Sequence, residues 1–301
     1  SSNSSSSTTN FGFQTVKKNE KQKLVNQVFS SVANNYDIMN DVMSGGIHRL
    51  WKDYFVRQLN PHPSINLLDV AGGSGDIAFR CAHHIEQRCL DHGEQVLPFE
   101  TLAHMESNIT VCDINENMLR VGGERAHVQN QFEPTNQEHS QFSRSFMRQG
   151  AHVACHLSFV QGNAELLPFD DCSFDAFTIA FGIRNTTNID SVLDEAYRVL
   201  VPGGRFMCLE FTPKLTTKYF PESDQYLNDV YDRYSMEVIP VLGDIIAQDQ
   251  PSYQYLVESI RRFPSQTVFK QMIKDAGFQS VTFENLHPFG VCAVHSGFKL
   301  H

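Results

Sequence analysis

The sequence predicts a doubly wound α/β fold built on a mostly parallel sheet. Apolar runs of strand length alternate with amphipathic stretches of helical period, and one run, INLLDV, leads directly into the glycine-rich turn AGGSGD. The chain has 301 residues, of which 41% are hydrophobic and 19% charged. This composition provides a sizeable core for one large domain or two small ones.

The order of the predicted elements supports this fold class. Apolar spacing near the helical period predicts two helices between residues 20 and 59, followed by strand and helix in alternation. The expected strands of the sheet are residues 65–70, 108–114, 156–162, 174–181 and 204–211. Helices are expected from Asp76, from about Glu116, over 189–200 and again after 224. The pair 279–285 and 290–298 is expected to form an antiparallel hairpin, which reverses the last strand.

Three polar segments lie outside this alternation. Residues 83–107 and 128–154 are rich in His, Gln, Asn and Glu, and we expect surface insertions with little fixed structure, because they bury little apolar area. Residues 1–19 are expected to be a disordered tail ahead of a single domain over 20–301. The opening SSNSSSSTTN is typical of the end of an organellar transit peptide or of a flexible start.

Charge and cysteine usage exclude several classes of function. A net charge of −10 argues against a nucleic-acid partner, because a phosphate backbone requires a basic face. The seven cysteines form no CxxC pair and the histidines show no ligand spacing, so we predict reduced thiols and no metal site. No apolar run approaches the ~20 residues that cross a bilayer.

The glycine turn is the first candidate binding feature. Gly72 and Gly73 allow a tight turn and let a ligand approach the backbone closely. Gly73, Gly75 and Ala78 also satisfy the G-x-G-x-x-A form of a dinucleotide-binding turn. Taken alone, the turn leaves open a dinucleotide site, another cofactor site and a plain tight turn.

Polar residues at the ends of three strands narrow this choice. Asp69 ends the strand before the glycines, where its carboxylate attracts a cation and repels a pyrophosphate. Asp113 ends the second strand and suits the two hydroxyls of a ribose. After the third strand, a polar residue, Asn163, stands beside a small one, Ala164. Together these residues favour a positively charged nucleoside over a nicotinamide dinucleotide.

This order of motifs, with PGG before the fifth strand, resembles the class I S-adenosylmethionine-dependent methyltransferase fold, a Rossmann-like fold. The resemblance implies a seven-stranded sheet with a reversed last strand, N-terminal helices as a lid, and S-adenosylmethionine as co-substrate. It assigns cofactor binding to Asp69, Gly72, Gly73, Ser74, Asp113, Asn163 and Ala164.

Two longer motifs indicate the family. YDIMNDVMSGGIHRLW, residues 36–51, resembles the first signature of the UbiE-type ubiquinone and menaquinone biosynthesis C-methyltransferases. RVLVPGGRFMCLEFT, residues 198–212, resembles the second, with Val201 where lysine is usual and Thr212 where serine is usual. The resemblance covers residues 20–80, 109–125, 157–212 and 226–300, and it is strongest to the mitochondrial branch of the family.

The resemblance implies transfer of a methyl group to a ring carbon of a polyprenyl methoxy-benzoquinol in ubiquinone biosynthesis. A ring carbon becomes nucleophilic when a neighbouring hydroxyl loses its proton, because the phenolate charge spreads to it. We expect Arg184 to stabilise that charge, with Asn185, Tyr36 and His48 as further catalytic candidates. For His48, a purely structural helix position is an equally open interpretation.

Related functions stay open at this point. The sheet motifs do not separate this reaction from methylation of a demethylmenaquinol or of another phenol. A non-catalytic, S-adenosylmethionine-binding scaffold in a quinone-synthesis complex is a further alternative. The resemblance also implies peripheral attachment to the matrix side of the inner mitochondrial membrane, other ubiquinone-synthesis proteins as partners, and a homodimer as one possible assembly.

Overall fold

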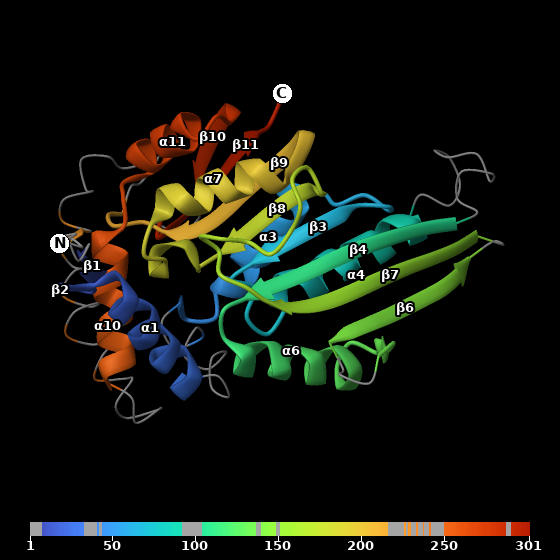
Figure 1. Ribbon diagram of the computed structural model, residues 1–301, viewed down its shortest axis with the longest axis horizontal. Helices are drawn as coiled ribbons and strands as arrows, with labels where there is room; N and C mark the ends of the chain where they lie inside the picture. Colours follow the sequence, from blue (N-terminus) through green and yellow to red (C-terminus); the bar gives the residue numbers. More distant parts are fainter. Residues whose placement is uncertain are drawn as a thin grey trace, which may run out of the picture.

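A single mixed sheet runs through the centre of the computed structural model (Figure 1). The structure describes residues 8–32, 41, 44–91, 104–136, 140–148, 151–215, 226, 228–229, 233, 237, 241, 250–286 and 290–301. Within these residues the sheet has nine strands in the order β10-β11-β9-β8-β3-β4-β7-β6-β5. The parallel centre consists of β3 (Asn66–Val70), β4 (His104–Asp113), β7 (Ala151–Gln161), β8 (Phe174–Ala180) and β9 (Leu200–Phe211). This confirms the predicted α/β class.

Antiparallel strands extend both edges of the parallel centre. Beyond β9 lie β11 (Cys292–Phe298) and β10 (Gln279–Asn285), which confirm the predicted hairpin and the reversed last strand. Beyond β7 lie β6 (Gln141–Arg148) and β5 (Glu133–Pro134), neither of which was predicted. The expectation of seven strands is therefore corrected to nine.

Helices cover both faces of the sheet and bury two apolar clusters. One cluster is formed with α3 (His48–Leu59), α4 (Asp76–Asp91) and α6 (Glu116–Val128), and the other with α7 (Ile189–Val199) and α11 (Gln266–Asp275). At one end of the molecule α1 (Lys18–Val32) lies beside α10 (Gln250–Arg262) (Figure 1). None of the helices in the described part of the chain is long and apolar enough to cross a bilayer.

The central strand β3 illustrates why these residues form a covered parallel sheet. Leu67, Leu68 and Val70 are completely buried, because helices lie over both faces of the strand. The run ends where Ala71, at φ 51°, turns the backbone away from the strand, and α4 begins at Asp76. The carboxyl end of β3 is thus joined to a helix by a tight turn.

The interpretation of residues 128–154 as an insertion with little structure is wrong for the described residues. Phe142 pairs with Leu157 of β7 and packs edge-on against Phe159, with ring centroids 5.8 Å apart. Arg144 lies over the Phe132 ring, 4.8 Å from its centroid. Phe142 is buried, whereas Gln141 and Ser145 are exposed, so the polar composition of this segment includes residues on the solvent side of the strand.

The same correction applies to the ends of the segment 83–107. Helix α4 continues to Asp91, and β4 already begins at His104, whereas residues 92–103 lie outside the described part. The polar residues that follow residue 82 form the solvent side of an amphipathic helix that buries Ile85. Glu86 on this helix pairs with Arg144 of β6 at 2.8 Å.

The expectation of a disordered tail over 1–19 is corrected for residues 8–19. β1 (Thr8–Phe11) and β2 (Gln14–Lys17) form an antiparallel hairpin, and α1 begins at Lys18. The Phe11 ring stacks on Tyr255 of α10 at 4.2 Å, and the backbone amide of Phe13 donates to Glu258 at 2.9 Å. Residues 1–7 lie outside the described part. Aromatic contacts to α10 therefore hold a segment whose composition indicated disorder.

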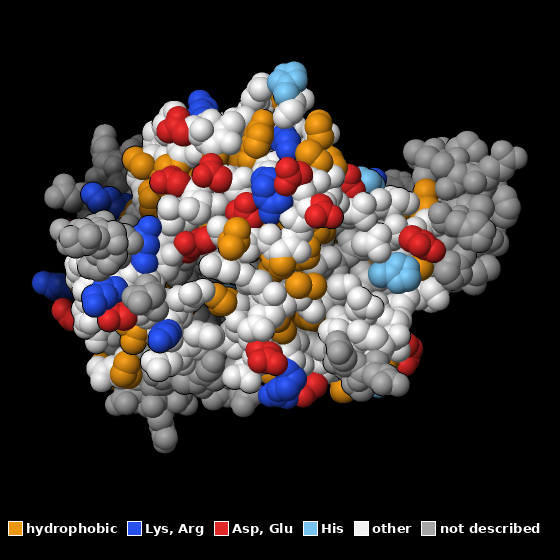
Figure 2. Space-filling model, viewed as in Figure 1, with side chains coloured by type: hydrophobic (Ala, Val, Ile, Leu, Met, Phe, Trp, Pro, Cys, Tyr) orange, Lys and Arg blue, Asp and Glu red, His pale blue; other side chains and the backbone are white. Residues whose placement is uncertain are grey.

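Charges of both signs are interspersed over the face of the molecule seen in Figure 2. Some of these charges form ion pairs: on α7, Arg198 lies 2.7 Å from both Asp171 and Glu195. Exposed pairs of this kind contribute ~0–1 kcal/mol each. The two buried clusters therefore contribute most of the stability of the sheet.

Candidate functional site

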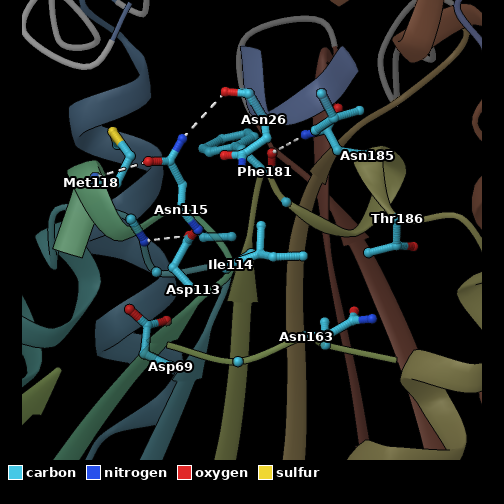
Figure 3. A pocket seen from close by; sticks show the side chains of 18 of the residues that line it. Asn26, Asp69, Asp113, Ile114, Asn115, Met118, Asn163, Phe181, Asn185 and Thr186 are labelled. Atoms are coloured by element: carbon cyan, nitrogen blue, oxygen red, sulfur yellow. Dashed lines mark hydrogen bonds between the residues drawn. The ribbon is translucent and has the colours of Figure 1, made fainter. Parts of the chain in front are cut away.

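A cavity lies at the carboxyl ends of β3, β4, β7 and β8, and Gln22, Val25 and Asn26 of α1 form part of its wall (Figure 3). Its free space amounts to about 1180 Å³, including the part that is open to solvent. Ligands of open parallel sheets bind at this edge. An early helix therefore contributes to the wall, whereas the lid role of the N-terminal helices stays a prediction.

All seven residues predicted to bind a cofactor line this one cavity. They are Asp69, Gly72, Gly73, Ser74, Asp113, Asn163 and Ala164. Their convergence follows from the topology, because the carboxyl ends of adjacent parallel strands meet at the same edge of the sheet. The individual contact of each residue with a cofactor stays a prediction.

The glycine turn lies against its neighbours without room for a side chain. A Cβ atom on Gly72 would lie 2.6 Å from Asp69 Oδ2 and 2.8 Å from Val111 Cγ1. Gly73 has φ 54°, a conformation that strains other residues, and a Cβ atom there would lie 3.0 Å from Met118 Cε. The turn therefore requires glycine at both positions, and both glycines line the cavity.

Asp69 is completely buried, and one of its carboxylate oxygens has no hydrogen-bond partner in the structure. The hydroxyl of Thr178 donates to Oδ1 at 2.8 Å, while Oδ2 is the unpartnered atom. Burial raises the pKa of Asp69 to about 7, with the nearby carboxylates of Asp76 and Asp113 adding to the increase. A cation bound in the cavity would satisfy Oδ2 and favour the ionised carboxylate.

This environment predicts that Asp69→Asn stabilises the free protein. The folded chain holds a proton on Asp69 between its ordinary pKa of 3.8 and about 7, so this stabilising contribution is lost as pH rises through that window. At pH 8 the variant should be more stable than the wild type by about 1–3 kcal/mol, because a buried charge is removed. Urea unfolding at pH 5 and pH 8 measures the difference, which should be larger at pH 8.

The matched control is Asp175→Asn, because Asp175 accepts from the backbone amide of Asn66 at the opposite end of β3. A pH-independent effect of Asp69→Asn, equal to that of the control, would contradict the assignment of the raised pKa to Asp69.

Asp113 fixes the turn and keeps acceptor capacity toward the cavity. Its Oδ2 accepts from the Gly73 amide at 2.9 Å, and its Oδ1 accepts from the Asn115 amide at 2.8 Å. Burial raises the pKa of Asp113, while these backbone donors oppose the increase. The Ile114 amide is a third backbone donor to this carboxylate. Because a carboxylate has about four acceptor sites, one site is left for a ligand hydroxyl.

Several lining residues were not predicted from the sequence. Asn115 caps α6 by accepting from the Met118 amide at 3.2 Å, and its Nδ2 reaches the carbonyl of Asn26 at 3.4 Å (Figure 3). This contact joins the start of α6 to the helix above the cavity. An asparagine placed before the helix at Glu116 is an N-cap signal that could have indicated Asn115. Helical periodicity does not reveal which side of α1 faces a ligand.

The four catalytic candidates are not brought together among the described residues. Asn185 lines the cavity, and Tyr255 of α10 donates to its Oδ1 at 3.1 Å. Tyr36 lies outside the described residues. Arg184 and His48 are not among the residues that line the cavity.

Arg184 is held in a buried ion pair. Its Nη1 lies 2.8 Å from Glu210 Oε1, and the two side chains are 3% and 1% exposed. The guanidinium also donates to the carbonyl of Phe181 and to the hydroxyl of Ser259. It lines a second cavity, which shares Thr186 and Thr187 with the first. The positive charge of Arg184 is thus already balanced by a carboxylate.

His48 is buried at the start of α3, with its Nδ1 2.9 Å from the hydroxyl of Ser44 and 3.7 Å from Asp41. Burial lowers the pKa of His48 to about 4, and the nearby charge of Lys52 lowers it further. The imidazole is therefore neutral near pH 7 and is hydrogen-bonded within its own helix region. Its catalytic role stays a prediction.

Comparison with solved structures confirms the predicted methyltransferase fold. A SAM-dependent methyltransferase of Thermotoga maritima, described as a possible histamine N-methyltransferase, shares 16% identity, with a TM-score of 0.53 over 91% of this chain and 99% of that chain. A phosphoethanolamine N-methyltransferase 2 of Haemonchus contortus, solved with S-adenosyl-L-methionine, shares 13% identity, with a TM-score of 0.50 over 83% of this chain and 52% of that chain. At these identities the likeness concerns the fold alone.

Sequence comparison identifies much nearer relatives. The mitochondrial 2-methoxy-6-polyprenyl-1,4-benzoquinol methylases of Bos taurus and Mus musculus are 48% and 50% identical to this chain, over 97% of it and 84% of their own lengths. The Drosophila melanogaster protein of the same name is 50% identical over 97% of this chain and 85% of its own length. The sequence model of one family matches residues 14–299, so the chain belongs to the ubiE/COQ5 methyltransferase family.

Proposed function

We propose that the chain catalyses the S-adenosylmethionine-dependent C-methylation of a polyprenyl methoxy-benzoquinol ring in ubiquinone biosynthesis. The observation that carries the proposal is the cavity at the carboxyl edge of the sheet, where Asp69 presents an unpartnered carboxylate oxygen beside the glycine turn. Its chemistry suits a cationic nucleoside, in a chain that is 48–50% identical to methylases acting on such a quinol.

The residues present fit S-adenosylmethionine. When bound, this co-substrate supplies a methyl group on a positively charged sulfur. Asp69 would balance positive charge, Asp113 would accept from the ribose hydroxyls, and Asn163 with Ala164 would hold the adenine. The lack of side chains at Gly72 and Gly73, which line the cavity, would allow the ligand to lie against the turn.

Asn185 is the residue best placed to contact the quinol oxygen. Asn185 lines the cavity, and Tyr255 donates to its Oδ1 at 3.1 Å, so a hydrogen of the amide nitrogen is available for a ligand. That nitrogen lies 3.5 Å from the Phe181 carbonyl, which is a weak contact. A preorganised N–H donor stabilises a phenolate, which is the form of the quinol with a nucleophilic ring carbon.

Arg184 would support this geometry as a positioning residue. It ties the short helix η2 (Ile183–Asn185) to Glu210 of β9 and to the Phe181 carbonyl, which Asn185 also contacts. In this proposal Asn185 touches the substrate, and Arg184 holds the turn that carries Asn185. Direct stabilisation of the phenolate by Arg184 would require its charge to be released from Glu210.

A methylation assay tests the proposed function. The purified chain is incubated with S-adenosylmethionine and either a short-tailed demethylated methoxy-benzoquinol or a demethylmenaquinol, both kept reduced, and methylated rings are identified by mass spectrometry. We expect the product from the benzoquinol. Turnover of demethylmenaquinol alone would replace this substrate with the menaquinone one, and co-substrate binding without turnover of either quinol would support a scaffold.

The location and partners belong to the same proposal. The relatives named above are mitochondrial proteins, and a polyprenyl quinol resides in a membrane. We therefore place the chain peripherally on the matrix side of the inner mitochondrial membrane. Association with other ubiquinone-synthesis proteins in a complex, and formation of a homodimer, stay predictions that co-purification from mitochondria would test.

A further inference from the structure

A buried lysine faces the cavity beside Asp69. Lys52 comes from α3, is 5% exposed, and lies in the cavity wall. Its Nζ donates to Asp76 Oδ2 at 2.7 Å, and Arg80 donates to the other oxygen of Asp76 at 3.0 Å. Lys52 has three donor hydrogens, so one contact with Asp76 leaves donors that can be directed to a ligand.

Lys52 also differs in charge from the other ionisable side chains that line the cavity. Among the described residues that line it, Lys52 is the one cation, whereas four lining side chains are carboxylates: Asp69, Asp76, Asp113 and Glu165. Such a wall attracts the positive groups of a sulfonium amino acid and repels its carboxylate. A ligand that carries both signs therefore has one favourable location for its negative end.

The topology separates Lys52 from the residues that suit a nucleoside. Asp113 and Asn163 follow β4 and β7, which lie on one side of β3 in the sheet. Helix α3, which carries Lys52, packs on α4 and against β9, on the other side of β3. Lys52 and the residues that suit a nucleoside thus reach the cavity from different elements.

We propose that Lys52 binds the α-carboxylate of the methyl donor, and that Asp69 and Asp76 accept from its α-ammonium group. This inference rests on the proposed function, because it concerns the amino-acid end of S-adenosylmethionine. The pair of Lys52 and Asp76 matches that end in sign, with an ammonium for the carboxylate and a carboxylate for the ammonium. Lys52 is then a specificity-determining residue that selects co-substrates with an intact amino-acid group.

Binding of two ligands by calorimetry tests the proposal. The ligands are S-adenosylmethionine and its decarboxylated form, which retains the sulfonium, the nucleoside and the terminal ammonium. The wild type should bind S-adenosylmethionine at least about tenfold more tightly. Lys52→Met should lose about 10–100-fold of the affinity for S-adenosylmethionine and less than about threefold for the decarboxylated ligand. Lys52→Arg should keep the preference of the wild type.

The matched control is Lys21→Met. Lys21 is another buried lysine, 6% exposed, whose Nζ donates to the Thr186 carbonyl at 2.6 Å, and it is not in the wall of this cavity. Its substitution should leave the ratio of the two affinities unchanged.

Two results would overturn the assignment of Lys52: equal affinity of the wild type for both ligands, or equal weakening of both by Lys52→Met. The first of these uses the wild type alone and does not depend on the folding of a variant. A wild type that binds neither ligand would instead overturn the proposed function, together with this inference.

Discussion

Replacing Glu210 with glutamine is expected to lower the free energy of unfolding by about 3–5 kcal/mol, because it leaves the buried charge of Arg184 without its partner. Glu210 lies 2.8 Å from Arg184, and it also accepts from the backbone amide of Phe211 at 2.8 Å. Burial raises the pKa of Glu210, and the guanidinium of Arg184 opposes the increase. Glutamine retains the volume, loses the charge, and turns one acceptor oxygen into an NH2 donor that cannot accept from the Arg184 amide or guanidinium.

Urea unfolding of four variants checks this expectation: the two single changes Glu210→Gln and Arg184→Met, their combination, and a control. Asp171→Asn is the matched control, because Asp171 pairs with Arg198 at 2.7 Å but is 74% exposed. This variant should lower the free energy of unfolding by less than about 1 kcal/mol. The combination of Glu210→Gln with Arg184→Met should lower the free energy of unfolding by less than the sum of the two single changes. The reason is that a protein without either partner has no unpaired buried charge. Strict additivity, or a Glu210→Gln effect as small as that of the control, would contradict the buried pair.

Gly72→Ala is expected to weaken binding of S-adenosylmethionine by at least about 100-fold, which corresponds to about 2.7 kcal/mol. The new methyl group would lie 2.6 Å from Asp69 Oδ2 and 2.8 Å from Val111, so the carboxylate or strand β4 must move. Either movement displaces a group proposed to face the co-substrate. Overpacking should also lower the free energy of unfolding by about 1–3 kcal/mol.

Gly203→Ala is the control that separates the loss of stability from the loss of co-substrate affinity expected for Gly72→Ala. Gly203 lies at the start of β9, has φ 88°, and has no atom within 4 Å of the position a Cβ would take. This change strains the backbone and should cost about 1 kcal/mol of stability without altering co-substrate affinity, which calorimetry measures. Affinity in Gly72→Ala within about threefold of the wild type would contradict the role of the glycine turn.

The parallel centre of the sheet and the cofactor cavity were predictable because each rests on local patterns. Continuous apolar runs such as INLLDV require cover on both faces, and this requirement fixed the fold class. Asp69, Asp113 and Asn163 each follow a strand, and parallel strands bring their carboxyl ends to one edge. No long-range contact had to be known in order to place these residues together.

The remaining features depend on contacts between distant segments. The polar composition of residues 141–148 gave no sign that they would pair with β7, because half of a strand at the edge of a sheet faces solvent. Likewise, the sequence around Arg184 does not predict its ion pair with Glu210, because Glu210 lies in β9, a strand distant in the sequence. Lys52 lies six residues after Gly46, in a helix whose orientation over the cavity depends on packing.

The length of β4 and β7 has a consequence for how this chain can change through evolution. β4 has 10 residues and β7 has 11, whereas β3 has 5, so their amino ends and the attached β6 project beyond β3, away from α1 (Figure 1). The groups proposed to bind the methyl donor follow the opposite ends of the strands. Insertions and deletions at the projecting ends should therefore be tolerated by selection, and reporter sequences could be placed there without loss of activity.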